Sequence, residues 1–119
     1  YFRENYRADS GVIAALVVLK ALSQYQGKLS ELLEPFNRYE NSGELNFSVP
    51  DVEASIDQIA EHYKTSIVDR LDGLTVDVGN WWFNLRPSNT EPLLRLNIEA
   101  NNKKICAQAI EEVRTLLSQ

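Results

Sequence analysis

"NWWFNLRPSNTEPLLRLNIEA", residues 80–100, contains two largely apolar runs around a short polar segment that lies between two prolines. Large apolar side chains alternate with polar ones in both runs, which is typical of β-strands that bury one face. The segment between the runs is rich in Ser, Asn and Pro, which turns prefer. The stretch therefore predicts a β-hairpin.

One register of this hairpin places all of its large apolar side chains on one face. Its pairs are Leu85 with Leu94, Phe83 with Leu96, and Trp81 with Ile98. The opposite face then carries Trp82, Asn84, Arg86, Arg95, Asn97 and Glu99. This register predicts that Arg86 and Arg95 share one face near the same end of the hairpin.

The remainder of the chain predicts further helices and strands. Residues 28–36 form a short helix that stops near Pro35, and residues 38–49 form two short strands around the turn at residues 41–43. Residues 51–64 have the apolar spacing of a helix capped by Asp51, and residues 65–79 are rich in strand. A last helix follows Asn101 or Asn102. This order predicts an α+β fold, a mainly antiparallel sheet with two helices packed on one face.

The apolar run at residues 11–22 predicts a helix that begins near Gly11, capped by Asp9 or Ser10. Apolar residues cover most of its circumference, and such helices are usually buried on several sides. We therefore expect this helix to pack against a neighbouring domain that the chain does not contain. A self-contained domain with a central helix is the alternative. Without its neighbours, the helix is expected to promote self-association.

Composition limits the classes of function. The net charge is −5, so the chain lacks the basic face that binds nucleic acids and anionic membranes. The single cysteine cannot form an internal disulfide, which fits a cytoplasmic location. The chain contains no methionine and no visible secretory signal, and we expect it to be a piece of a longer protein.

The polar loop of the hairpin has the chemistry of an anion site. Guanidinium groups donate paired hydrogen bonds to phosphate, and hydroxyl and amide groups donate further ones. The candidate donors are Arg86, Ser88, Asn89, Thr90 and Arg95. The backbone N–H groups of residues 88–90 are expected to form an anion nest. Pro87 and Pro92 stiffen the loop before a ligand binds, and Glu91 is expected to turn away.

An ordinary hairpin connection explains the same composition, and the residues alone leave both interpretations open. Other residues of interest have structural explanations. His62 is expected on the solvated side of its helix, Cys106 and Trp81 in the core, and Trp82 on the opposite face of the sheet.

Three stretches resemble the α-D-phosphohexomutases, most of all the bacterial phosphomannomutase/phosphoglucomutase members. "LRPSNTEPLLRLNIEA" (85–100) resembles their C-terminal phosphate-binding loop. "FRENYRADSGVIAALVVL" (2–19) resembles the end of their third domain, and "SGELNFSVPD" (42–51) resembles the start of their fourth. The resemblance implies that residues 1–37 are a remnant of domain III. It also implies that residues 38–119 are domain IV, with a TATA-box-binding-protein-like fold.

The resemblance also implies a function. Such enzymes interconvert hexose 1-phosphate and hexose 6-phosphate through a phosphoserine on the first domain and a Mg²⁺ held by aspartates of the second. The fourth-domain loop grips the phosphate that is not reacting. Carried onto this chain, phosphate binding falls on Arg86, Ser88, Asn89 and Thr90. Glu91 and Arg95 also match the motif, and the resemblance implies that they support the phosphate-binding residues.

The chain lacks the phosphoserine loop, the Asp-x-Asp-x-Asp metal loop and the sugar-reading Glu-x-Ser-Gly-His loop of these enzymes. The resemblance therefore implies no catalytic residue, no bound metal and no mutase activity for the chain alone. Its implied partners are a phosphosugar and the remaining domains of the full-length enzyme. The alternative is a stand-alone, non-catalytic module that recognises phosphate on a small molecule or a phosphoprotein.

Overall fold

The computed structural model describes residues 1–118 and divides the chain into two compact units, residues 1–38 and a second unit that begins at Tyr39. The first unit contains helices α1 (Gly11–Gln24) and α2 (Leu29–Leu33) and the 3-10 helix η1 (Glu34–Phe36). The strands of the second unit are β1 (Glu40–Phe47), β2 (Ile67–Asp69), β3 (Leu74–Asp77), β4 (Trp81–Pro87) and β5 (Leu94–Ala100). Its helices are α3 (Val52–His62) and α4 (Lys103–Leu117).

Helix α1 begins where the sequence predicts, because the Ser10 hydroxyl accepts a hydrogen bond from the Ile13 N–H at 3.3 Å. Its apolar side chains, among them Val12, Leu16 and Leu19, are exposed. No helix within residues 1–118 is long and apolar enough to cross a membrane. The second short helix also follows the prediction, with Pro35 in the 3-10 turn that ends it.

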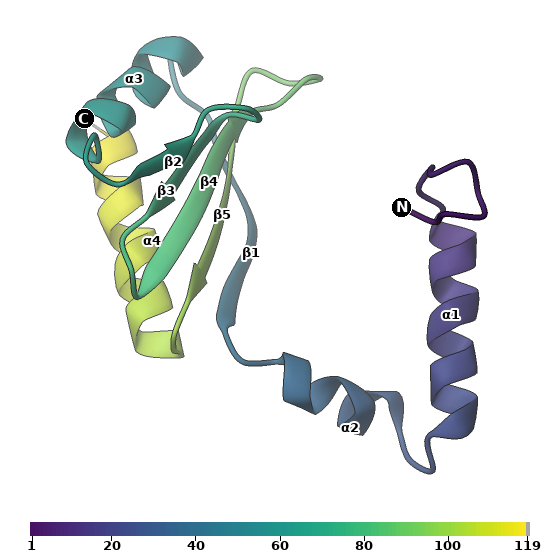
Figure 1. Ribbon diagram of the computed structural model, residues 1–119. Helices are drawn as coiled ribbons and strands as arrows, with labels where there is room; N and C mark the ends of the chain where they lie inside the picture. Colours follow the sequence, from purple (N-terminus) through teal and green to yellow (C-terminus); the bar gives the residue numbers. More distant parts are fainter. Residues whose placement is uncertain (119) are drawn as a thin grey trace. The chain divides into compact units, whose positions relative to one another are not determined.

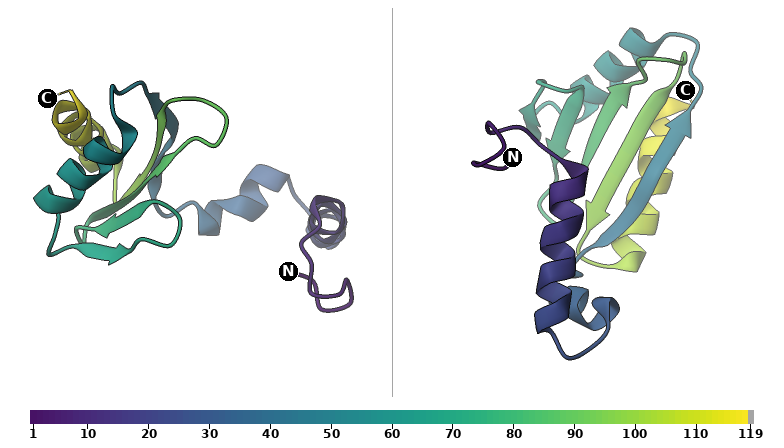
Figure 2. Two further views of the ribbon diagram at one scale, coloured as in Figure 1. Left: turned by 90° about the horizontal axis from the view of Figure 1, so that it is seen from above. Right: turned by 90° about the vertical axis from the view of Figure 1, so that its right-hand side faces the viewer.

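The second unit is a two-layer α+β structure, which confirms the predicted fold class (Figures 1 and 2). Its sheet has the strand order β1-β5-β4-β3-β2, and every neighbouring pair is antiparallel. Helices α3 and α4 pack on one face of this sheet. The core between the layers contains the fully buried side chains Ile59, Leu74, Val76, Phe83, Leu85, Leu94, Leu96, Ile98 and Val113. We call the other face of the sheet the open face.

The hairpin of β4 and β5 is paired two residues away from the predicted register. The observed pairs are Leu85 with Leu96, Phe83 with Ile98, Trp81 with Ala100, and Pro87 with Leu94. The predicted pairing of Leu85 with Leu94 is therefore wrong. The ladder extends further toward the loop than expected, where the Ser88 N–H donates to the Leu93 carbonyl at 2.9 Å. The predicted faces are confirmed, because a slip of two residues leaves every side chain on its face.

The prediction of two strands around residues 41–43 is also wrong, because β1 is one strand with a β-bulge at this point. Gly43 has φ of 67°, a conformation that glycine adopts without strain. The Ser42 hydroxyl accepts the Ile98 N–H at 2.9 Å in place of a ladder bond. The extra residue shifts the alternation of the strand, so Leu45 lies opposite Leu96 in the core and Glu44 faces away from it.

The helices of the second unit begin at the predicted caps. Asp51 accepts a hydrogen bond from Ala54 N–H at 3.0 Å, and Asn102 accepts one from Ile105 N–H at 3.0 Å. The large apolar side chains of both helices, including the predicted ones of residues 51–64, form the core or pack against it. His62 is exposed, while Trp81 and Cys106 are buried, all as expected.

Two groups near these helices have shifted pKa values. The Tyr63 hydroxyl donates to Glu112 Oε1 at 2.5 Å and so links the end of α3 to α4. Burial, and then this hydrogen bond and the charge of Glu112, raise the pKa of Tyr63. Burial, and then the charge of Glu40, raise the pKa of the Cys106 thiol.

Candidate functional site

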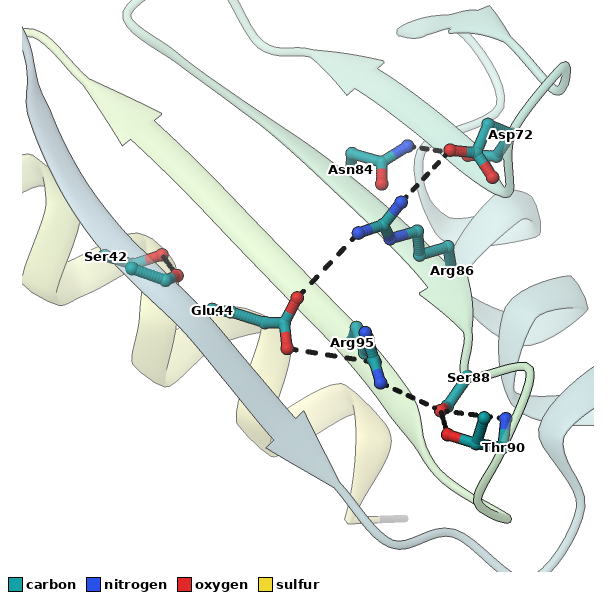
Figure 3. A network of polar contacts seen from close by, with 9 residues as sticks. Ser42, Glu44, Asp72, Asn84, Arg86, Ser88, Thr90 and Arg95 are labelled. Atoms are coloured by element: carbon teal, nitrogen blue, oxygen red, sulfur yellow. Dashed lines mark hydrogen bonds and ion pairs between the residues drawn. The ribbon is translucent and has the colours of Figure 1, made fainter. Parts of the chain in front are cut away.

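Two arginines on the open face form the centre of the site. Arg86, near the end of β4, lies directly opposite Arg95, near the start of β5. Neither belongs to the apolar face of its strand, so both side chains project from the face that α3 and α4 leave uncovered (Figure 3). The predicted neighbourhood of the two arginines is therefore confirmed.

Glu44 lies between the two guanidinium groups (Figure 3). Its Oε2 is 3.8 Å from Arg86 Nη2, and its Oε1 is 3.8 Å from Arg95 Nε. Arg95 Nε is buried and has no hydrogen-bond partner among residues 1–118. The carboxylate of Glu44 therefore offsets the charge of this nitrogen without bonding to it directly. The bulge of β1 puts Glu44 in this position, because it turns the side chain toward the open face.

Asp72 contacts Arg86 from the side of the β2–β3 turn. Arg86 Nη1 donates to Asp72 Oδ2 at 3.2 Å. Asn84 Nδ2 donates to the backbone carbonyl of Asp72 at 2.8 Å and thereby ties the turn to β4. Gly73 has φ of 75°, and a Cβ at this position would lie only 2.8 Å from Arg86 Cα. Glycine is therefore required both for the turn and for its close approach to Arg86.

The loop between β4 and β5 is held by its own polar side chains. Arg95 Nη2 donates to the Ser88 hydroxyl oxygen at 3.2 Å, and Thr90 N–H donates to the same oxygen at 3.4 Å. The hydroxyls of Ser88 and Thr90 lie 3.4 Å apart. Two of the three N–H groups of the predicted anion nest are used within the loop, because the Ser88 N–H donates to the Leu93 carbonyl and the Thr90 N–H donates to the Ser88 hydroxyl oxygen.

Several of these groups line one hollow of about 330 Å³ on the open face. Its polar lining consists of Asp72, Arg86, Ser88, Asn89, Thr90 and Arg95. The structure therefore brings together the five donors singled out from the sequence. Within the described chain, Glu91 lies outside this lining and its side chain is exposed.

Sequence reasoning missed two carboxylates of this site, Glu44 and Asp72. Glu44 is in the "SGELNFSVPD" stretch, where the Asn-Ser-Gly segment resembled a hairpin turn rather than a bulge. Asp72 falls within residues 65–79, for which the sequence predicts strands and no site residue. The signal for Asp72 was its neighbour Gly73, since an Asp-Gly turn brings a carboxylate to the end of the sheet where the arginines lie.

The charges of the side chains in the site balance one another. Arg86 and Arg95 contribute two positive charges, and Glu44 and Asp72 contribute two negative ones at distances of 3.2 to 3.8 Å. Residues 1–118 contain no group of three or more His, Cys, Asp or Glu side chains placed to hold a metal ion. The side chains that line the hollow include two guanidinium groups, two hydroxyls and an amide, all of which can donate hydrogen bonds.

Comparison with protein families identifies a match to "Phosphoglucomutase/phosphomannomutase, C-terminal domain" over residues 44–116. Comparison with individual proteins extends the similarity over the entire chain. A phosphomannomutase of Methanocaldococcus jannaschii is 43% identical over 119 residues, which are 100% of this chain and 26% of that protein. Phosphohexose mutases of Xanthomonas campestris pv. campestris are 42% identical over 118 residues, covering 97% of this chain and 25% of those proteins.

A solved structure shares the fold. The crystal structure of a phosphoglucomutase/phosphomannomutase family protein from Burkholderia thailandensis superposes with a TM-score of 0.72 at 23% sequence identity. The match covers 98% of this chain and 25% of that chain. The present chain thus spans about a quarter of the length of the curated relatives it matches.

Proposed function

The chain belongs to the phosphoglucomutase/phosphomannomutase family, and from this premise we propose that it anchors the substrate phosphate in an enzyme that interconverts hexose 1-phosphate and hexose 6-phosphate. One observation carries the proposal. Arg86, Ser88, Asn89, Thr90 and Arg95 line a single hollow on the open face. Each of these side chains offers hydrogen-bond donors, and two of them carry a permanent positive charge. Family membership favours this role over a stand-alone phosphate-reading module.

The roles of the residues follow from their chemistry. Arg86 presents its planar guanidinium to the phosphate, and the hydroxyls of Ser88 and Thr90 and the amide of Asn89 donate further hydrogen bonds. Arg95 holds the Ser88 hydroxyl oxygen in place at 3.2 Å and adds charge. Glu91 is exposed and stays away from the phosphate. Its charge there does not repel the ligand.

An anchor of this kind supports phosphoryl transfer without taking part in it. Such transfer depends on positioning and charge stabilisation. Binding energy at the remote phosphate orients the reacting end of the sugar. Because the loop contacts only the phosphate, it can bind the phosphate group of either hexose 1-phosphate or hexose 6-phosphate. The Mg²⁺ of the full-length enzyme, held by other domains, would neutralise charge on the transferring phosphoryl group.

We also propose that residues 1–37 are the end of domain III and that the following residues are domain IV. The alignments to relatives cover both parts of the chain, whereas the family match begins at residue 44. The exposed apolar side chains of α1 support the same assignment, because they require cover from a neighbouring domain. The proposed partners are a phosphosugar and the other domains of a cytoplasmic enzyme, with no role for nucleic acids or membranes.

A titration of the labelled chain with mannose 6-phosphate, followed by amide chemical shifts, tests the anchor. A few charge-assisted and neutral hydrogen bonds, less the cost of association, give a dissociation constant of about 1 mM. The shifts should centre on residues 86–90. An absence of shifts there, or shifts centred elsewhere, would contradict the proposal.

Arg86→Lys is the informative variant, because it keeps the positive charge but removes the planar guanidinium group that can donate two hydrogen bonds to one phosphate. It should weaken binding about tenfold. Arg70→Lys is the matched control, since Arg70 is exposed and forms only a 3.7 Å ion pair with Asp57. Its affinity should equal that of the unaltered chain.

The second part of the proposal is that the chain alone has no mutase activity. Incubation with glucose 1-phosphate and glucose 1,6-bisphosphate, followed by phosphorus NMR, should give no glucose 6-phosphate. Turnover that survives purification to homogeneity and is lost in Arg86→Lys would overturn this part.

A further inference from the structure

Building on the proposed function of the loop, we propose that Asp72 is an internal counter-ion of Arg86 that a phosphate must displace on binding. Asp72 and the phosphate compete for the same guanidinium group. The carboxylate of Asp72 therefore lies where a ligand anion would pair with Arg86, and binding is an exchange of one anion for another.

The two carboxylates near Arg86 differ in how firmly they are held. Glu44 is on strand β1, its side chain is 39% exposed, and it lies 3.8 Å from both arginines. The side chain of Asp72 is 78% exposed and contacts only one of them, at 3.2 Å. Asp72 thus forms the shorter contact and is also the carboxylate that water reaches more easily. A well-hydrated carboxylate can leave its partner at little cost, because exposed ion pairs stabilise a protein only slightly.

The turn that carries Asp72 stays in place while its side chain moves. Asn84 Nδ2 holds the backbone carbonyl of Asp72 at 2.8 Å. Gly73 packs so closely on β4 that a Cβ would lie 2.6 Å from Arg86 Cβ. These contacts involve the backbone of the turn and not the carboxylate. Displacement therefore requires rotation of one exposed side chain, and the hollow keeps its shape.

The position of Asp72 in the lining makes the competition direct. Asp72, Arg86 and the donors of the loop surround the same hollow. A phosphate that contacts Arg86 there meets the carboxylate of Asp72, and two like charges at this distance repel each other. The phosphate gains the Nη1 donor of Arg86 only when Asp72 has moved away.

This arrangement selects among anions. Because Glu44 and Asp72 balance the charges of Arg86 and Arg95, the site does not attract anions by net charge alone. An entering anion must compete with a carboxylate that is tethered beside Arg86, in an exposed ion pair that contributes only slightly to stability. A phosphate dianion has more charge and more acceptor oxygens than chloride or acetate. The exchange thus favours phosphate monoesters over monoanions.

Asp72→Asn tests the proposal by removing the charge while retaining the shape of the turn. Titration with mannose 6-phosphate should give a dissociation constant about twofold to fivefold lower than that of the unaltered chain. Asp72→Ala should tighten binding at least as much. Asp77→Asn is the matched control, because it makes the same charge change at the other end of β3 and should leave the affinity unchanged. Acetate should compete more effectively in the two Asp72 variants than in the control.

A measurement without ligand tests the ion pair by itself. The side-chain N–H signals of Arg86 should move and exchange faster with water in Asp72→Asn than in Asp77→Asn. Unchanged signals would overturn the proposal, as would an affinity in Asp72→Asn that is equal to or weaker than that of the unaltered chain. Failure of all variants and the unaltered chain to bind mannose 6-phosphate would overturn the anchoring function together with this inference.

Discussion

Arg86 and Arg95 lie directly opposite each other in the ladder of β4 and β5. Like charges in this position destabilise a sheet unless something offsets them. Glu44 provides the offset, with one carboxylate oxygen 3.8 Å from each guanidinium group. Glu44 thereby lets the fold tolerate two arginines at directly opposite positions.

Glu44→Gln should therefore lower the free energy of unfolding by about 1 kcal/mol, because it leaves the two arginines facing each other. Urea unfolding followed by tryptophan fluorescence measures this change. Both tryptophans, Trp81 and Trp82, are in the second unit. The signal therefore reports the unit that contains the site.

A double-mutant cycle with Arg95→Gln isolates the contact itself. Glu44 and Arg95 should show a coupling free energy of about 0.2 to 1 kcal/mol. The coupling should shrink in about 1 M salt, where charges are screened over a few ångströms. A coupling of zero at low salt would show that the carboxylate has no stabilising effect between the arginines.

Gly73→Ala should lower the free energy of unfolding by about 2 to 4 kcal/mol. The added Cβ forces a residue with φ of 75° into strain and meets Arg86 Cα at 2.8 Å. Gly79→Ala is the control, with φ of 96° and no atom of residues 1–118 within 4 Å of the added Cβ. Gly79→Ala should lower the free energy of unfolding by only about 1 to 2 kcal/mol, because backbone strain is its only effect. Equal effects of the two variants would mean that the turn does not pack tightly on β4.

Stability should fall as the pH rises above about 10, where tyrosine ionises in an unfolded chain. The pKa of Tyr63 is raised in the folded state by its burial and by Glu112, so Tyr63 keeps its proton when the unfolded chain has lost it. Folding then becomes less favourable as pH rises, whereas the contribution of Tyr63 is fully present below pH 10. The pKa of Cys106 is also raised in the folded state, so Cys106 likewise lowers the stability of the fold as the pH rises above about 9.

Tyr63→Phe should flatten this alkaline decline in unfolding free energy, measured by urea titrations between pH 8 and pH 11. Tyr39→Phe is the control, because Tyr39 is exposed and should leave the slope unchanged. An identical slope in Tyr63→Phe and the unaltered chain would contradict the assigned shift of the Tyr63 pKa.

Removal of residues 1–38 should leave the second unit folded. The core residues identified within the described chain all come from positions after Tyr39. Amide spectra of the shortened chain should therefore overlay those of the full chain for residues 44–116. Collapse of the spectrum would show that the first unit stabilises the second.

The same truncation should abolish self-association. The exposed apolar side chains of α1 form the surface that we expect to promote it. Sedimentation of the full chain should depend on concentration, and sedimentation of the shortened chain should not. A full chain that sediments as a monomer at all concentrations would remove this expectation.

Local patterns in the sequence are sufficient to predict most of the elements and their faces. The caps of α1, α3 and α4 and the apolar stripes of the last two helices depend on residues a few positions apart. The alternation of apolar residues in β4 and β5 assigns Arg86 and Arg95 to the open face in any register that keeps the core apolar. The polar loop between Pro87 and Pro92 likewise indicates Ser88, Asn89 and Thr90 as candidate donors by their residue types alone.

Only the tertiary structure decides which distant groups meet. The register of the hairpin differs by two residues from the predicted one, and the alternation of apolar residues cannot distinguish them because it satisfies both. The bulge at Gly43 and the turn at Gly73 bring Glu44 and Asp72 to Arg86 across 42 and 14 positions of sequence. No local periodicity encodes such contacts. They arise because the sheet places β1 beside β5, with β4 and β3 following on its other side.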